Sequence, residues 1–173
     1  IFKVMKNYLE KIISVKEINK NIGKFPREKK IAMCHGVFDL VHPGHIRHLS
    51  YAKSQCDKLI VSITSDIHVK KAQFRPYVPE RLRAENLAAL EFVDYVLIDK
   101  NETPLINLEL IKPDYFVKGY EYNDLSQNKK TKEEKDILQN YGGEFLFSPG
   151  DYVLSSSKII ENERPDLSLI KLK

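Results

Sequence analysis

Five short apolar runs, each separated from the next by a stretch with helical spacing, constrain the fold of this chain more than any other feature. The runs cover residues 31–34, 59–63, 95–98, 115–117 and 145–147. Strands that alternate with helices pair in parallel, because each helix carries the chain back across the sheet before the next strand begins. The sequence therefore predicts an α/β fold around a five-stranded, mainly parallel sheet.

Start and stop signals mark helices between these runs. Ser14 and Glu17 form a capping-box pattern for a helix that ends near Gly23. Thr103 as N-cap, with Pro104 in the first turn, predicts a later helix. Further helical patterns follow the first run, occupy 79–91, pass through Ile137 and Leu138, and begin at Ser155–Ser157. Helices on both faces of the sheet predict a three-layer α/β/α, Rossmann-like arrangement.

Two expectations concern side-chain exposure. In the segment 79–91 we place Leu82 on the apolar face and Arg83 on another face. The charged and polar run 128–135 is predicted to be a solvated loop. Residues 1–163 then form one domain, with 1–23 as a helical N-terminal extension and 164–173 as a tail or linker.

Composition excludes several classes of protein. The 173 residues contain no run of eighteen apolar residues, and the mixed N-terminal stretch is too short for a signal peptide. The net charge of +4 comes from interspersed lysines and acids without a basic stripe, so nucleic acid is not a predicted partner. The two cysteines, Cys34 and Cys56, are expected to be reduced core residues. We expect a cytoplasmic protein without a membrane partner.

The turn after the first run concentrates residues that suit a phosphate. Pro43 fits the first turn of a helix, and Gly44 lets an anion approach the backbone. The N-terminus of that helix lies at the carboxyl end of a strand, where ligands bind in open α/β sheets. His42 and His45 stand three residues apart, so both imidazoles can reach one bound group.

Zinc is the alternative ligand for this turn. His35, His48 and His68 lie nearby in the sequence, but cysteine and acidic ligands at matching spacing are absent. We therefore predict no metal site in the protein, and a structural or surface role for these three histidines.

The other strand ends add hydroxyls and cations. Thr64-Ser65-Asp66 follows the second run, Lys118-Gly119 follows the fourth, and the three serines at 155–157 follow the fifth. The segment 68–79, with Lys70, Lys71 and Arg75, is read as a loop over the site. Because no activated serine or cysteine is evident, this inventory favours transfer of a phosphoryl-type group by positioning and charge stabilisation.

These residues also carry a family resemblance. Gly36-Val37-Phe38-Asp39 followed by His42-Pro43-Gly44-His45 resembles the HxGH signature of the cytidylyltransferase-like nucleotidyltransferases. Further segments resemble the adenylyltransferase domain of heptose 1-phosphate nucleotidyltransferases: Arg75-Pro76, Pro79 to Arg83, Ala88 to Glu91, Val93-Asp94, Val117 to Gly119 and Ser155 to Ser157. The resemblance extends from about residue 14 to residue 162.

The resemblance implies a reaction in which a sugar phosphate attacks the α-phosphorus of a nucleoside triphosphate and pyrophosphate leaves, with Mg²⁺ on the phosphates. It implies that His42, His45 and Lys71 are catalytic. The implied nucleotide-binding residues are Gly36, Val37, Phe38, Gly44, Arg83, Lys118, Gly119, Ser155, Ser156 and Ser157, and the implied acceptor-binding residues are Asp39 and Arg75. It also implies a homodimer. For Arg83, pairing with a carboxylate is the alternative.

Departures from the family pattern leave the substrate open. Lys71 is followed by Ala72 where glycine is usual, and Tyr120-Glu121-Tyr122 replaces a common Gly-Asp-Tyr. The segment 123–140 is longer than in the heptose enzymes. ATP and CTP both remain candidates. The alternatives are a cytidylyltransferase for glycerol 3-phosphate and a non-catalytic nucleotide-binding module of a longer chain with a fused sugar-kinase domain.

Overall fold

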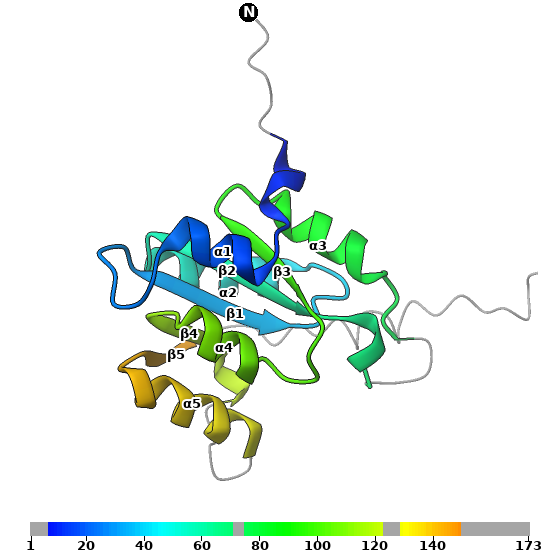
Figure 1. The fold of residues 1–173 in the computed structure, drawn as a ribbon. Helices are drawn as coiled ribbons and strands as arrows, with labels where there is room; N and C mark the ends of the chain where they lie inside the picture. The colour runs from blue at the N-terminus through cyan, green and yellow to red at the C-terminus, as the bar shows by residue number, and fades with distance from the viewer. Residues whose placement is uncertain (1–6, 71–74, 123–128, 150–173) are drawn as a thin grey trace, which may run out of the picture.

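A five-stranded, entirely parallel sheet forms the centre of the chain (Figure 1). The computed structural model describes residues 7–70, 75–122 and 129–149. The strands are β1 Ile31–Gly36, β2 Lys58–Thr64, β3 Tyr95–Asp99, β4 Tyr115–Gly119 and β5 Glu144–Ser148, in the spatial order β3-β2-β1-β4-β5. The predicted five-stranded α/β fold is confirmed, and each strand contains the apolar run from which it was predicted.

Helices cover both faces of this sheet and complete the three predicted layers. They are α1 Val15–Ile22, α2 Pro43–Ser54, α3 Glu80–Ala88, α4 Leu105–Ile111 and α5 Lys129–Tyr141, with short 3-10 turns η1 Tyr8–Lys11, η2 Asp66–His68 and η3 Tyr120–Tyr122. The helices α2 and α3 pack on one face, and α1, α4 and α5 pack on the other. None of the described helices has both the length and the apolar character needed to cross a membrane.

The central strand β1 shows why the sheet needs both layers. Ala32 and Cys34 join the core under α2 and α3, whereas Ile31 and Met33 join the core under α1, α4 and α5. All four side chains are fully buried, as expected for a parallel strand covered on both faces. Cys34 is a free thiol, as predicted, and so is the half-buried Cys56.

The capping box predicted at the start of α1 is confirmed. The Ser14 hydroxyl accepts a hydrogen bond from the backbone N–H of Glu17 at 3.3 Å, and the Ser14 N–H donates to the Glu17 carboxylate at 2.9 Å. The helix ends before Gly23, whose φ of 77° suits glycine. At α4 the prediction is one residue off, because Pro104 itself is the N-cap.

The expected loop at 128–135 is wrong, because α5 begins at Lys129. Within its first two turns, Thr131 and Glu134 are buried and contact the Lys118 ammonium group. The run is rich in charge, but one side of it is needed to cover the end of β4. A buried ion pair cannot be distinguished from a solvated face by composition alone.

Candidate active site

In the turn between β1 and α2, the ring of Phe38 packs against the backbone of Gly36 and against the ring of His45. A Cβ atom on Gly36 would lie 3.1 Å from Cε2 of Phe38, so a side chain at this position would crowd the ring. Phe38 has a φ of 50°, which is costly for a residue with a side chain. Its ring is buried and meets the His45 ring edge-on, with 5.0 Å between centroids. The buried ring of Phe38 therefore packs against His45 and limits the positions that the His45 ring can take.

His42 and His45 are stacked. Their ring centroids are 3.8 Å apart and the ring planes differ by 23°, so the spacing of three residues brings both imidazoles to one place, as the sequence predicted. His42 is the N-cap of α2, yet its side chain makes no capping hydrogen bond. Its Nδ1 is buried without a hydrogen-bond partner among the residues that the structure describes. Burial lowers the pKa of His42, so this imidazole is neutral near pH 7.

The start of α2 offers backbone donors beside these rings. Pro43 occupies the first helical position, and the first intrahelical bond is donated by Ile46 to the His42 carbonyl at 3.2 Å. The N–H of Gly44 therefore has no intrahelical acceptor. With the helix dipole, such an N-terminus attracts an anion, and a phosphate is the anion that imidazoles and a glycine backbone accommodate.

Asp39 and Arg75 face each other rather than an open site. The Asp39 carboxylate accepts hydrogen bonds from the backbone N–H groups of Tyr77 and Val78 at 3.0 and 2.8 Å. Arg75 Nε lies 2.6 Å from the same carboxylate, and the Asp39 side chain is only 1% exposed. Both side chains are engaged within the protein, and the expected contact of these two residues with the acceptor stays a prediction. They attach the loop 75–78 to the turn.

Arg83 corrects the side-chain exposure expected for the segment 79–91. Its side chain is 0% exposed, although the sequence placed Leu82 on the buried face, and Leu82 is instead half exposed. Its guanidinium donates to the carbonyl oxygens of Val37, Thr64 and Val78 and to the Asp66 carboxylate. The guanidinium therefore joins the turn to the end of β2 and pairs with a carboxylate, as the alternative interpretation predicted. Its contact with a phosphate stays a prediction.

Lys118 and Gly119 lie at the predicted edge of the sheet, but the lysine is already paired. Its ammonium group donates to the buried carboxylate of Glu134 and, at 3.2 Å, to the Thr131 hydroxyl. It also lies 4.9 Å from the centre of the Tyr122 ring. Burial raises the pKa of Glu134 more than the neighbouring lysine lowers it. The Lys118 ammonium is therefore engaged inside the protein, and the contact of Lys118 and Gly119 with a nucleotide stays a prediction.

His35 and His48, for which the sequence predicts a structural or surface role, contact strand ends at the same edge of the sheet. His35 Nδ1 lies 2.9 Å from Ser62 Oγ, and its Nε2 lies 3.2 Å from Thr64 Oγ1. His48 Nδ1 lies 2.8 Å from Ser148 Oγ at the end of β5. Burial lowers the pKa of both histidines to about 4, so both are neutral near pH 7. The predicted structural role fits both contacts. In the sequence, His35 is marked as close to the site only because it directly precedes Gly36.

The remaining expected residues lie outside the described part of the chain. These are Lys71 and the three serines Ser155, Ser156 and Ser157. Their contacts with phosphate or nucleotide stay predictions.

The described side chains of the turn offer little to a magnesium ion held by the protein. Protein-bound Mg²⁺ usually takes one or two carboxylates together with substrate phosphates. The one carboxylate between Gly36 and His45 is Asp39, and both of its oxygens are engaged by the loop. In the described ranges no group of three or more His, Cys, Asp or Glu side chains is arranged to hold a metal ion. The described side chains of the turn therefore do not suit a magnesium ion held by the protein alone, and Mg²⁺ on the phosphates stays a prediction.

Comparison with known proteins identifies the family of this chain. Residues 33–162 match the model of the cytidylyltransferase-like family. The bifunctional protein HldE of Bradyrhizobium sp. is 38% identical over 79% of this chain, and that of Rhodopseudomonas palustris (strain BisB5) is 38% identical over 90%. The matches cover only 27% and 31% of these relatives, so the chain spans less than a third of their length.

Solved structures share the fold. The lipopolysaccharide core biosynthesis protein from Thermoplasma volcanium aligns with a TM-score of 0.59 and 24% identity, over 70% of this chain and 97% of that one. The pantoate-beta-alanine ligase from Francisella tularensis aligns with a TM-score of 0.57 and 17% identity, over 91% of this chain and 80% of that one. The family match includes the stacked histidines and the ends of all five strands. The predicted enzyme class is thereby confirmed at the level of the family: this chain belongs to the cytidylyltransferase-like nucleotidyltransferases.

Proposed function

We propose that this domain transfers a nucleotidyl group from ATP or CTP to the phosphate of a phosphorylated sugar such as heptose 1-phosphate, with release of pyrophosphate. The observation that carries this proposal is the stacked pair His42 and His45 on the N-terminus of α2. The resemblance of the chain to heptose 1-phosphate enzymes supports the acceptor class, and the family match supports the reaction type.

In the reaction, an oxygen of the acceptor phosphate forms a bond to the α-phosphorus, and the bond from that phosphorus to the bridging oxygen breaks. A neutral imidazole can donate one N–H to the α-phosphate or to the departing oxygen, where negative charge grows. The acceptor phosphate is ionised near pH 7, so its attack needs no strong base. Mg²⁺ bound to the triphosphate would neutralise charge on its oxygens. Lys71 is proposed as a further cation for the same phosphates.

The test is pyrophosphate release with ATP and with CTP, each against heptose 1-phosphate and glycerol 3-phosphate. We expect turnover with heptose 1-phosphate. Turnover with glycerol 3-phosphate and CTP alone would favour the alternative acceptor, and no turnover with any pair would favour a non-catalytic nucleotide-binding module. A sugar-kinase domain on the same chain and a homodimeric state remain part of the proposal.

The role of the histidine pair has its own variant. His45→Ala should lower kcat by about 10²-fold to 10³-fold while nucleotide affinity changes little, because the contact is made mainly in the transition state. Ile46→Ala is the matched control, since its side chain is exposed on the next position of α2. An unchanged rate for His45→Ala would remove this residue from the mechanism.

A further inference from the structure

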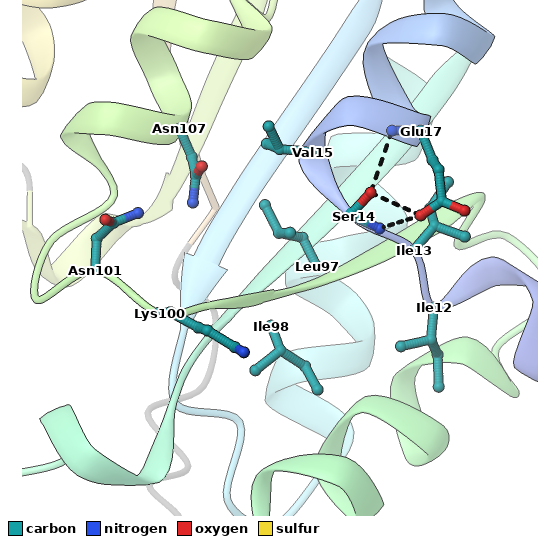
Figure 2. A pocket seen from close by; sticks show the side chains of 10 residues that line it. All are labelled: Ile12, Ile13, Ser14, Val15, Glu17, Leu97, Ile98, Lys100, Asn101 and Asn107. Atoms are coloured by element: carbon teal, nitrogen blue, oxygen red, sulfur yellow. Dashed lines mark hydrogen bonds between the residues drawn. The ribbon is translucent and has the colours of Figure 1, made fainter.

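The two faces of the sheet differ in what they offer to the imidazole pair. Beside α1 and α4 lies a cavity of about 430 Å³, whose lining includes Val15, Leu97 and Asn107 (Figure 2). His42 and His45 belong to α2, which packs on the opposite face of the sheet. Side chains that position the two imidazoles directly therefore lie between α2 and the strands on its own face.

His48 joins α2 to the carboxyl end of β5. Its Nδ1 lies 2.8 Å from Ser148 Oγ, and the Ser148 hydroxyl in turn donates to the Lys118 carbonyl at 3.3 Å. Ser148 is 3% exposed, so the contact lies inside the protein. One chain of hydrogen bonds thus runs from α2 through the end of β5 to the end of β4.

The direction of this chain of bonds follows from the chemistry of its three groups. A carbonyl oxygen can only accept, so the bond to Lys118 uses the single proton of the Ser148 hydroxyl. The Ser148 oxygen then accepts from His48, which requires the ring proton of His48 to lie on Nδ1. Burial lowers the pKa of His48 to about 4, so near pH 7 the neutral ring has one proton to place.

Strand register places this chain of bonds beside the candidate active site. Gly119 of β4 is paired with Ser148 of β5. In the neighbouring pair, Cys34 of β1 is opposite Val117 of β4, and both strands end two residues later, at Gly36 and Gly119. Gly36, Gly119 and Ser148 therefore end three neighbouring strands at one level of the carboxyl edge. The turn that leads to the imidazoles begins directly after Gly36.

The helix α2 connects His48 rigidly to the imidazole pair. His48 follows His45 by three residues, so the two side chains share one side of the helix and are about 4.5 Å apart along its axis. The helix is continuous from Pro43 to Ser54. A bond that fixes His48 against β5 thus also fixes the position of His45 relative to the ends of β4 and β5.

We propose that His48 is a positioning residue: its Nδ1 proton, through Ser148, holds α2 where the stacked imidazoles meet the phosphates of the nucleotide. This inference rests on the proposed function. His48 acts through His42 and His45 and does not itself touch the substrate. A displacement of about 1 Å in a reacting group can cost a factor of about 10² in rate, so a loosened α2 should be seen in kcat.

Steady-state kinetics test the positioning role. His48→Phe keeps a ring without the donor, and Ser148→Ala removes the middle of the chain of bonds. Each should lower kcat about tenfold, and the double variant should lose no more than either single one, because both break the same connection. His48→Asn should recover most of kcat, since its amide nitrogen is bonded to Cγ as Nδ1 is.

Two conditions separate positioning from stability. Rates are measured well below the unfolding temperature of each variant, where a loss of stability alone leaves kcat unchanged. Ser50→Ala, at an exposed position of α2, is the matched control and should keep the kcat of the unsubstituted chain.

The ring proton is observed directly by NMR. Long-range proton–nitrogen correlation spectra at pH 7 should show His48 as the tautomer protonated on Nδ1. A ring protonated on Nε2 would overturn the chain of bonds. In Ser148→Ala the ring signals of His42 and His45 should move, and in Ser50→Ala they should stay in place.

The outcomes separate this inference from the proposed function. If the unsubstituted chain turns over and folded His48→Phe keeps its kcat, His48 does not position the imidazoles, although the reaction stands. If the unsubstituted chain shows no turnover with any substrate pair, the proposed function fails and the spectra decide. Signals of His42 and His45 that move in Ser148→Ala would then support the positioning role, and unchanged signals would overturn it.

Discussion

Replacing Arg83 by methionine should destabilise the domain strongly. The guanidinium is 0% exposed and satisfies three backbone carbonyls and the Asp66 carboxylate. Methionine fills a similar volume but donates no hydrogen bond, so the three carbonyls lose their donor, whereas the Asp66 carboxylate is 38% exposed and can regain water. Hydrogen bonds to charged groups contribute about 1.5 to 3 kcal/mol each. We expect a loss of about 4 kcal/mol in the free energy of unfolding.

Urea unfolding followed by circular dichroism at pH 7 measures this loss. Arg81→Met is the matched control, because Arg81 lies on the same helix, is 83% exposed and pairs only with Glu85 in the next turn. The control should change the free energy of unfolding by about 0.5 kcal/mol or less. A loss below about 1 kcal/mol for Arg83→Met, together with a raised KM for the nucleotide, would refute the structural role and restore the phosphate contact expected from the sequence.

Three further results are expected. His48 should lower the free energy of unfolding by about 2 kcal/mol between pH 7 and pH 4.5. The reason is that burial lowers the pKa of His48 to about 4 in the folded chain, whereas the unfolded chain takes up this proton near pH 6.5. Urea unfolding repeated across this pH range should show a smaller drop for His48→Phe. Gly36→Ala should lower the melting temperature by a few degrees, since the new Cβ would crowd Phe38; calorimetry showing no change would contradict this packing. Glu134→Leu should lower the free energy of unfolding, measured in urea, by about 3 kcal/mol, because the Lys118 ammonium stays buried without its carboxylate. Adding Lys118→Met to this variant should recover part of the loss. If the two substitutions lower the free energy of unfolding additively, the pair is not coupled.

The layered fold follows from patterns that are local in the chain. Each strand is a short apolar run, α1 begins at a capping box, and α2 begins at a proline, so propensity and burial agree at each of these positions. The stacking of His42 on His45 is local as well, because three residues separate them on one helical turn. Such features need no knowledge of distant segments.

The contacts that the sequence did not reveal belong to polar side chains whose partners are distant in the sequence. Arg83 binds the carbonyl of Val37, which is 46 residues away, and Asp39 binds the N–H of Val78, which is 39 residues away. A charged side chain is buried only when the folded chain brings it a partner, and composition does not state which partner arrives.

The sequence alone thus determined the parallel sheet, the site at its carboxyl edge and the pair of imidazoles on α2, because these depend on spacing along the chain. Only the tertiary structure decided that Arg83, Asp39 and Lys118 are engaged inside the protein. Hydrogen-bond satisfaction is settled by which segments meet in space, and that information is absent from any single stretch of residues.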